Sequence, residues 1–385
     1  MIGKPVARLD DDDVRSLRAV TSKICGDLLE ESLTAPEVGL PFVPTLWDAL
    51  EDAGLLRMGL GSRSNGDGSG WEAAAIVLAE SARNAAPGPI METSFLSEWL
   101  LDQAGVQSIA GGPVTTGNGS FTREADDKVR MSAERVPWAR TADHVIVVGT
   151  LDDDVVVAVV PSRSAAMEDH ANVAFQPRES VTALLDPGDL HRVDPAVIDE
   201  WLLRGALGRS VPSCGALERA VEMSIEHVKT RQQFRRSLSG FQAVQHLLAS
   251  AASELAVATN AADVAVAEAS SLDFRRISTT LAVSAAKSQS SRAATVVARS
   301  CHQLHGVIGM TLDYPLRHFT LPALAWRNEF GNQSFWDGRI GRLAVTRGRG
   351  AWDLLTALAH WRAQREIDSK LRRFHGSGQS HFGTV

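Results

Sequence analysis

The stretch from Thr230 to His246 reads TRQQFRRSLSGFQAVQH and joins two helical patterns through a short basic interruption. Arg231 carries a fixed cation in a planar fork that suits a pyrophosphate. Gln233 and Gln242 each offer hydrogen-bond donors and acceptors, and Phe234 adds aromatic surface. An extended, planar, phosphate-bearing ligand requires such groups. Arg and Gln at helix ends also often only satisfy backbone carbonyls, so this stretch by itself leaves both interpretations open.

Apolar residues recur every three or four positions on both sides of this junction, which is the spacing of one face of an α-helix. The stripe before the junction consists of Leu207, Val211, Cys214, Leu217, Val221, Ile225 and Val228. The stripe after it consists of Phe241, Val244, Leu248, Ala251, Leu255, Ala258 and Ala262. Two further helices are predicted from Ile277 to Ser300 and from about Ile340 to Trp361. Four long helices with modest loops predict a four-helix bundle over 194–365, followed by a flexible tail over 366–385.

Two other regions precede the predicted bundle. Residues 1–110 are helical in pattern, with Leu46, Leu50, Ala53 and Leu56 at helical spacing. Residues 111–193 contain short β-branched runs, and those from Val145 to Val148 and from Val155 to Val160 predict a hairpin. Further strands are predicted at Val173–Phe175 and Val181–Leu185. The predicted fold is α+β and mainly α: an N-terminal helical domain, a small central β domain and a C-terminal four-helix bundle.

Composition excludes several classes of protein. The 385 residues carry a net charge of -7, which argues against a generic nucleic-acid binder. The three cysteines lie far apart, so neither a zinc site nor a disulfide framework is indicated. No signal peptide and no run of about 18 apolar residues occurs. We therefore expect a soluble, cytoplasmic protein that binds no metal and no membrane.

A second motif, CHQLHGVIGMTLDYP, extends from Cys301 to Pro315. Its glycines Gly306 and Gly309 allow the backbone to approach a ligand closely. Together with the first motif, it resembles the acyl-CoA dehydrogenase family of flavoproteins. That family carries Arg, any residue, Gln, Phe, a short turn and Phe-Gln, and later Gln, an apolar residue, His, two glycines, any residue and Gly. Gln303, His305, Gly306 and Gly309 match the later pattern, whereas Val307 replaces the second glycine.

The resemblance implies an FAD cofactor. It assigns Arg231, Gln233, Phe234 and Gln242 to the adenosine diphosphate part of FAD, which in this family is usually held mainly by a neighbouring subunit. It assigns Gln303, Gly306 and Gly309 to the segment that closes over the diphosphate. The implied substrate is an acyl-CoA thioester, and the implied partners are an electron-transfer acceptor and a second subunit in a homo- or hetero-oligomer.

The family's reaction requires a carboxylate that removes the α-proton of the thioester. Counted from the Tyr-Pro pair at 314–315, the family's usual position for this base is Phe330, and Glu329 lies one residue early. Glu329 is therefore the catalytic candidate in this chain, with a solvated loop acid as the alternative. Some relatives place the base 26 residues before the signature arginine, which is Gly205 here.

The predicted β domain matches the family weakly. Thr115, Thr116 and Ser120 are candidates for hydrogen bonds to the flavin ring, and Trp138 is the nearest equivalent of a tryptophan that flanks it. Arg339, Arg342, Arg347 and Arg349 could meet the phosphates of coenzyme A, or could form a solvated cluster.

These matches and departures favour one hypothesis over two alternatives. We expect one subunit of a hetero-oligomeric acyl-CoA dehydrogenase for a bulky, steroid-like or branched acyl group, whose partner supplies the base. The alternatives are a self-sufficient homo-oligomeric enzyme with Glu329 as base, and a non-catalytic subunit that binds acyl-CoA or acts as a scaffold.

Overall fold

A computed structural model describes residues 9–34, 38–58, 69–270 and 274–346 of the chain. The chain forms two compact units, Met1–Trp336 and Asp337–Val385. All of the strands and the helices α1 to α8 belong to the first unit. Among the described residues, no helix combines the length and apolar character needed to cross a bilayer.

The chain begins with helices that surround a common core. They are α1 (Asp11–Thr34), α2 (Pro44–Asp52), α3 (Ser69–Arg83), the π-helix η2 (Glu92–Ser97) and α4 (Glu98–Ala104). Pro44 starts α2, where its missing N–H costs no helical hydrogen bond. Gly105 ends α4 in the left-handed conformation, with φ of 68°. Leu46 and Leu50 are buried in α2 as predicted, whereas Ala53 is exposed at its C-cap and the buried Leu56 lies beyond its end.

A seven-stranded sheet follows, with strand order β5-β6-β2-β1-β3-β4-β7. Its strands are β1 (Val114–Arg123), β2 (Val129–Pro137), β3 (His144–Leu151), β4 (Asp154–Pro161), β5 (Ala166–Glu168), β6 (Arg178–Leu185) and β7 (Leu190–Val193). β1 and β3 are parallel, and every other neighbouring pair in this sheet is antiparallel. β3 pairs with β4 from His144↔Pro161 to Leu151↔Asp154, which confirms the predicted hairpin.

One strand prediction was wrong. Val173–Phe175 forms a turn, although Val181–Leu185 does lie in β6. The side-chain oxygen of Asn172 accepts hydrogen bonds from the backbone N–H groups of Ala174 and Gln176. This local pairing competes with a sheet ladder, and Phe175 has a φ of 59° that no strand allows.

Both faces of the central strands are buried, which explains their uninterrupted valines. Because side chains alternate along a strand, Val145 and Val147 pack in one apolar cluster and Ile146 and Val148 in another. The second cluster includes Trp99 of α4 and Val197 of the following helix. The sheet is therefore packed against α4 and the start of that helix.

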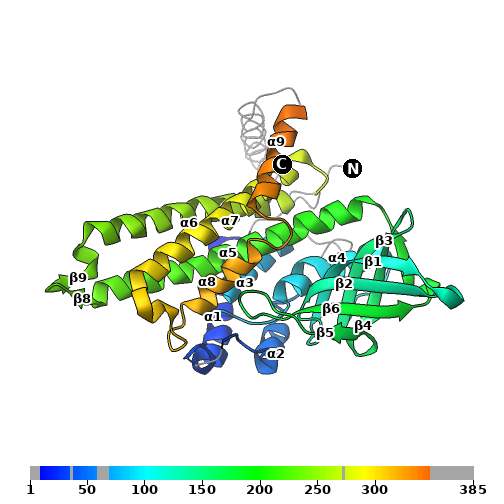
Figure 1. The fold of residues 1–385 in the computed structure, drawn as a ribbon, viewed down its shortest axis with the longest axis horizontal. Helices are drawn as coiled ribbons and strands as arrows, with labels where there is room; N and C mark the ends of the chain where they lie inside the picture. Colours follow the sequence, from blue (N-terminus) through cyan, green and yellow to red (C-terminus); the bar gives the residue numbers. More distant parts are fainter. Residues whose placement is uncertain (1–8, 35–37, 59–68, 271–273, 347–385) are drawn as a thin grey trace, which may run out of the picture. The chain divides into compact units, whose positions relative to one another are not determined.

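The remaining helices pack on one another and on α3. They are α5 (Ala196–Thr230), α6 (Gln242–Ala269), α7 (Ile277–His305) and α8 (Arg317–Trp326). α5 contacts α3, α6, α7 and α8 (Figure 1). Gly215 permits the contact with α3, because a Cβ there would lie 2.1 Å from the carbonyl oxygen of Ala79. The predicted α5 stripe is buried, apart from the partly buried Ile225. The mainly helical α+β fold class is confirmed.

The predicted fourth bundle helix differs from the structure. A helix α9 (Gln333–Thr346) begins earlier than the predicted start at Ile340, and the fourth helix that packs on α5 is α8. Residues 347–385 lie outside the described residues, together with the rest of the predicted helix and the predicted tail.

The basic interruption that joins α5 to α6 is a tight hairpin. β8 (Gln232–Gln233) pairs with β9 (Arg236–Ser237), and the 3₁₀ turn η6 (Leu238–Gly240) leads into α6. The two loop residues, Phe234 and Arg235, have φ values of 51° and 65°. This left-handed pair is the geometry of a type I′ turn, which usually takes Asn and Gly. The helical periodicity on either side of this hairpin did not predict its turn.

Candidate functional site

The two sequence motifs meet at one end of the helices. His227 lies in the last turn of α5, and His305 ends α7. Their rings stack with centroids 4.5 Å apart and an interplanar angle of 25°. Arg231 follows His227 by four residues, and Gly306 follows His305 directly. The tertiary structure therefore brings together two segments that are about 70 residues apart, at the end of α5 that carries β8 and β9 (Figure 1). This region is called the bundle end below.

The polar residues of the first motif are available at the bundle end. Arg231, Gln233 and Gln242 are exposed, and within the described residues their side chains form no hydrogen bond or ion pair. The nearby Arg236 differs, because its guanidinium lies 3.9 Å above the ring of Phe241. The first motif therefore does not cap helix carbonyls. It presents a cation and two amides to solvent.

Phe234 is 84% exposed at the tip of the hairpin, where its ring lies edge-on to Phe241 at 6.1 Å. An aromatic residue this exposed buries little apolar surface inside its own chain. It is therefore free to contact a ligand or another chain.

The second motif needs its two glycines for different reasons. Gly306 has φ of 63° and ψ of −140°, a conformation that disfavours a side chain. Gly309 is buried, and a Cβ there would lie 2.7 Å from the Cβ of His305. Gln303 is exposed. Val307, which stands where the family has glycine, is 83% exposed, so its bulk points away from the protein.

The two positions expected for a catalytic base meet elsewhere, near the start of α5. A Cβ on Gly205 would lie 2.1 Å from the ring of Phe330. The Phe330 ring therefore occupies the space above Gly205, and Trp201 packs on it with ring centroids 4.6 Å apart. Phe330 has φ of 53°, an uncommon conformation for a bulky residue. Both positions converge on one point, which an aromatic ring fills. Phe330, Gly205 and Trp201 are called the aromatic plug below.

Glu329, the candidate base, is held between two buried arginines. Its carboxylate lies 2.8 Å from Nη2 of Arg178 and 2.7 Å from Nε of Arg209. Burial acts to raise the pKa of Glu329, but the two cations outweigh it and hold the pKa at about 2. A carboxylate with this pKa has little tendency to accept a proton at neutral pH. Arg209 also pairs with Glu92 of η2. The contacts of Glu329 are thus those of a structural ion pair, and its catalytic role stays a prediction.

The other carboxylate close to Gly205 is also paired. Glu200 accepts two hydrogen bonds from Arg204, at 2.8 and 2.7 Å. The guanidinium of Arg204 lies within 5.1 Å of three ring centroids, those of Trp71, Trp99 and Phe274. Burial lowers the pKa of Arg204 to about 10, which still leaves it cationic at neutral pH. Glu200 therefore balances a buried charge.

The candidate flavin-ring residues are largely committed to internal contacts. Thr115 and Thr116 are buried in β1, and the Thr115 hydroxyl donates to the Pro137 carbonyl at 2.5 Å. Thr116 accepts from the indole N–H of Trp201, a member of the aromatic plug, at 3.4 Å. Ser120 is exposed on the same strand.

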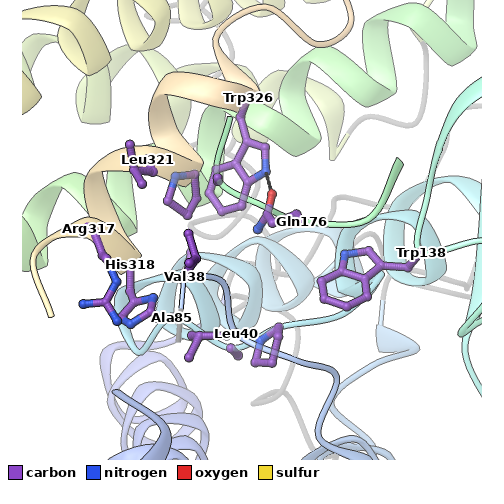
Figure 2. Close-up of a pocket in the computed structure, with 14 residues that line it drawn as sticks. Val38, Leu40, Ala85, Trp138, Gln176, Arg317, His318, Leu321 and Trp326 are labelled. Carbon is purple, nitrogen blue, oxygen red and sulfur yellow. Dashed lines mark hydrogen bonds between the residues drawn. The ribbon is translucent and has the colours of Figure 1, made fainter. Parts of the chain in front are cut away.

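Trp138 lines a small cavity together with Trp326, Gln176 and His318 (Figure 2). The cavity measures about 30 Å³, and the Trp326 indole donates to Gln176 beside it at 3.1 Å. A planar three-ring system does not fit in it.

The aromatic plug and the bundle end lie far apart. Gly205 and Arg231 are separated by 26 residues along or next to α5, which corresponds to about 39 Å at 1.5 Å per residue. Side chains at the two places cannot converge on one reacting atom.

Sequence reasoning missed the buried arginines that pair with Glu329 and Glu200. Arg204 and Arg209 both lie in the long apolar stretch of α5, and such a helix is expected to be buried on most sides. A charged residue in a buried segment needs a paired counterion. That signal could have identified Arg209 as a partner for an acid. The distant Arg178 of β6 and Glu92 of η2 gave no comparable signal, because their proximity depends on tertiary packing.

Comparison with known proteins agrees with this fold. Residues 196–342 match the sequence model described as "Acyl-CoA dehydrogenase, C-terminal domain", and this region contains both motifs. Residues 196–342 therefore belong to the acyl-CoA dehydrogenase C-terminal domain family.

Individual relatives of this chain are distant. Acyl-CoA dehydrogenase FadE27 of Mycobacterium tuberculosis is 26% identical over 337 residues, which cover 77% of this chain and 87% of that protein. A chain of the ChsE4-ChsE5 complex from Mycobacterium tuberculosis has a TM-score of 0.76 at 21% identity, over 87% of this chain and 97% of that one. The Tcur3481-Tcur3483 steroid ACAD has a TM-score of 0.71 at 21% identity, over 88% and 98% of the two chains. The two structures share the fold of this chain.

Proposed function

We propose that this chain is one subunit of a hetero-oligomeric acyl-CoA dehydrogenase. In the overall reaction, a carboxylate removes the α-proton of an acyl-CoA thioester while hydride passes from the β-carbon to FAD. The bundle end of this chain binds the adenosine diphosphate part of an FAD whose ring lies in the partner subunit. The partner subunit supplies the carboxylate base.

The observation that carries this proposal is the aromatic plug. Phe330 fills the space above Gly205, so both positions of a base are occupied by groups that cannot accept a proton. The neighbouring acids Glu329 and Glu200 neutralise buried arginines. Removing either acid from its pair would leave a buried guanidinium without its counterion, which is energetically costly. The region around Gly205 and Phe330 in this chain therefore stabilises the fold and, among its described residues, offers no free proton acceptor.

The residues at the bundle end fit the diphosphate of FAD. Arg231 offers a free cation, and Gln233 and Gln242 offer amide donors that no internal acceptor uses. Gly306 is exposed and keeps the adjoining backbone open to close approach, whereas Gly309 lets this segment pack on His305. The residues around Trp138 and Thr115 do not fit the flavin ring equally well, because the cavity there is small and the hydroxyl is used internally. This asymmetry supports fewer flavins than chains in the assembly.

We assign a bulky acyl group to the substrate by likeness to the steroid ACAD among the structural neighbours. An electron-transfer acceptor and a cytoplasmic location complete the proposal. Arg339 and Arg342 lie on the described part of α9 in the second unit, whereas residues 347 and 349 lie outside the described residues. Their contact with coenzyme A stays a prediction.

Co-expression with the product of an adjacent related gene tests the proposal. We expect the chain to be colourless when purified alone, and the co-purified complex to contain one flavin per pair of chains and to reduce a dye with an acyl-CoA. The control is a complex in which the partner's expected base is replaced by Gln, which should retain flavin and lose turnover. Yellow, active protein from this chain alone would favour the self-sufficient enzyme. A complex without flavin would favour the scaffold.

A further inference from the structure

The segment from Gly306 to Asp313 has no apolar anchor of its own. Its four large apolar side chains are all exposed, at 83%, 46%, 73% and 42% for Val307, Ile308, Met310 and Leu312. A segment that buries none of these side chains gains little stability from the hydrophobic effect. Other groups must therefore hold its backbone in place.

His305 supplies such contacts on several sides. Its Nδ1 lies 2.8 Å from the carbonyl oxygen of Cys301, and a carbonyl can only accept, so Nδ1 carries the hydrogen. Burial lowers the pKa of the His305 imidazole, so the ring is neutral at neutral pH. Nε2 is then an acceptor, and the Tyr314 hydroxyl donates to it at 3.0 Å. The backbone of Gly309 packs directly against the Cβ of His305.

The same ring reaches the other motif. His305 stacks on His227 of α5, one helical turn before Arg231. His305 thus directly precedes the segment 306–313, packs on Gly309 in its middle and bonds to Tyr314 just after it, and it also contacts the helix that ends in the hairpin. Within the described residues, this ring is a direct bridge between the two motifs.

We propose that His305 is a positioning residue, which holds the segment 306–313 and the end of α5 in a fixed arrangement for the diphosphate, with Tyr314 as its required hydrogen-bond donor. The inference rests on the proposed function for the ligand, but its structural part is independent of any ligand. Tyr314 is the only tyrosine of the chain, so its phenol can be followed without interference.

Hydrogen exchange in the full-length chain tests the structural part. Tyr314→Phe should raise the exchange rates of the amides in 306–313 about tenfold, the effect of losing one net hydrogen bond. His305→Ala should raise them in 306–313 and also in 231–236. The matched control is Ser284→Ala, which also removes one buried hydroxyl, the one that donates to the Thr280 carbonyl within α7. It should leave the exchange rates in both segments unchanged. Unchanged exchange in Tyr314→Phe, or an equal rise in Ser284→Ala, overturns the inference.

Two further measurements separate positioning from general stability. With ¹³Cζ-labelled tyrosine, the single resonance should move in His305→Ala and stay in place in Ser284→Ala. In the co-purified complex, Tyr314→Phe and His305→Ala should weaken FAD binding about tenfold or more, and His305→Gln, which keeps an acceptor for Tyr314, should recover part of the affinity. Affinity equal to wild type in both variants overturns the inference. A wild-type complex that binds no FAD contradicts the proposed function, and the exchange experiment still decides the role of His305.

Discussion

Glu329 illustrates how the role of a side chain depends on its neighbours. In the sequence it is a loop acid one position before the expected base. In the structure it is 21% exposed and pairs with Arg178 and Arg209, each about 5% exposed. Movement of this carboxylate toward a substrate would leave the buried Arg178 without its counterion and Arg209 with Glu92 alone, which is energetically costly.

Replacing this acid should therefore damage stability. Glu329→Gln leaves the buried Arg178 without its counterion and Arg209 with Glu92 alone, and we expect the free energy of unfolding to fall by about 3–5 kcal/mol. Urea denaturation measures the change. The control is Glu254→Gln, which breaks the more exposed pair with Arg292 and should cost about 0–1 kcal/mol. A variant of wild-type stability that has lost turnover would instead identify Glu329 as a base.

The same ion pair should make the free energy of unfolding depend on pH in the acid range. The pKa of Glu329 is about 2 in the folded state and 4.5 ordinarily, so the unfolded chain binds this proton more readily. Its contribution to stability is complete above pH 4.5 and is lost as the pH falls toward 2. Denaturation curves between these pH values should show this loss in the wild type and a smaller one in Glu329→Gln.

Helix α5 shows how glycines decide which elements can approach. Gly215 admits the backbone of α3, and Gly205 admits the ring of Phe330 from the loop after α8. Pattern analysis placed α5 correctly because an apolar stripe of three and four residue steps is a local property. It could not place the loop after α8 against Gly205, because that contact joins residues 125 positions apart in the chain.

A double-mutant cycle tests the aromatic plug. Gly205→Ala should destabilise the protein by about 1–3 kcal/mol, because its Cβ would overlap the Phe330 ring. In a Phe330→Ala background, the same change should be neutral or stabilising, since alanine is the better helix former. Thermal unfolding measures the coupling. Gly26→Ala in α1, where a Cβ meets nothing within 4 Å, is the control and should stabilise by about 0.5–1 kcal/mol. Additive effects of Gly205→Ala and Phe330→Ala would contradict the contact.

At the scale of the molecule, the candidate ligand-binding residues at the bundle end are separate from the positions expected for a catalytic base. The bundle end presents unpaired polar groups and exposed apolar ones, whereas the positions around Gly205 are filled and charge-balanced. About 39 Å of helix lies between them. An arrangement of this kind suits a subunit whose ligand-binding surface completes a site in another chain.

This separation predicts which variants change flavin content. In the co-purified complex, Arg231→Gln should weaken FAD binding about ten- to a hundredfold, because a charge-assisted hydrogen bond to phosphate is lost. Phe330→Ala should leave the flavin content unchanged, since the aromatic plug lies away from the bundle end. Arg163→Gln, the same charge change at an exposed residue next to β4, is the control. Absorbance at the flavin maximum after gel filtration gives the ratio. Equal flavin content in Arg231→Gln and Arg163→Gln would count against the proposed site.

The sequence by itself determined the fold class, the buried face of α5, the β3–β4 hairpin and the family. These depend on local periodicity and short motifs, which are written in neighbouring residues. Only the tertiary structure decided that Val173–Phe175 turns around Asn172, that Glu329 is held by arginines from β6 and α5, and that Phe330 covers Gly205. It also joined the two motifs through His227 and His305. The physical reason is that burial, ion pairing and ring packing join residues distant in sequence, and no local pattern encodes which ones meet.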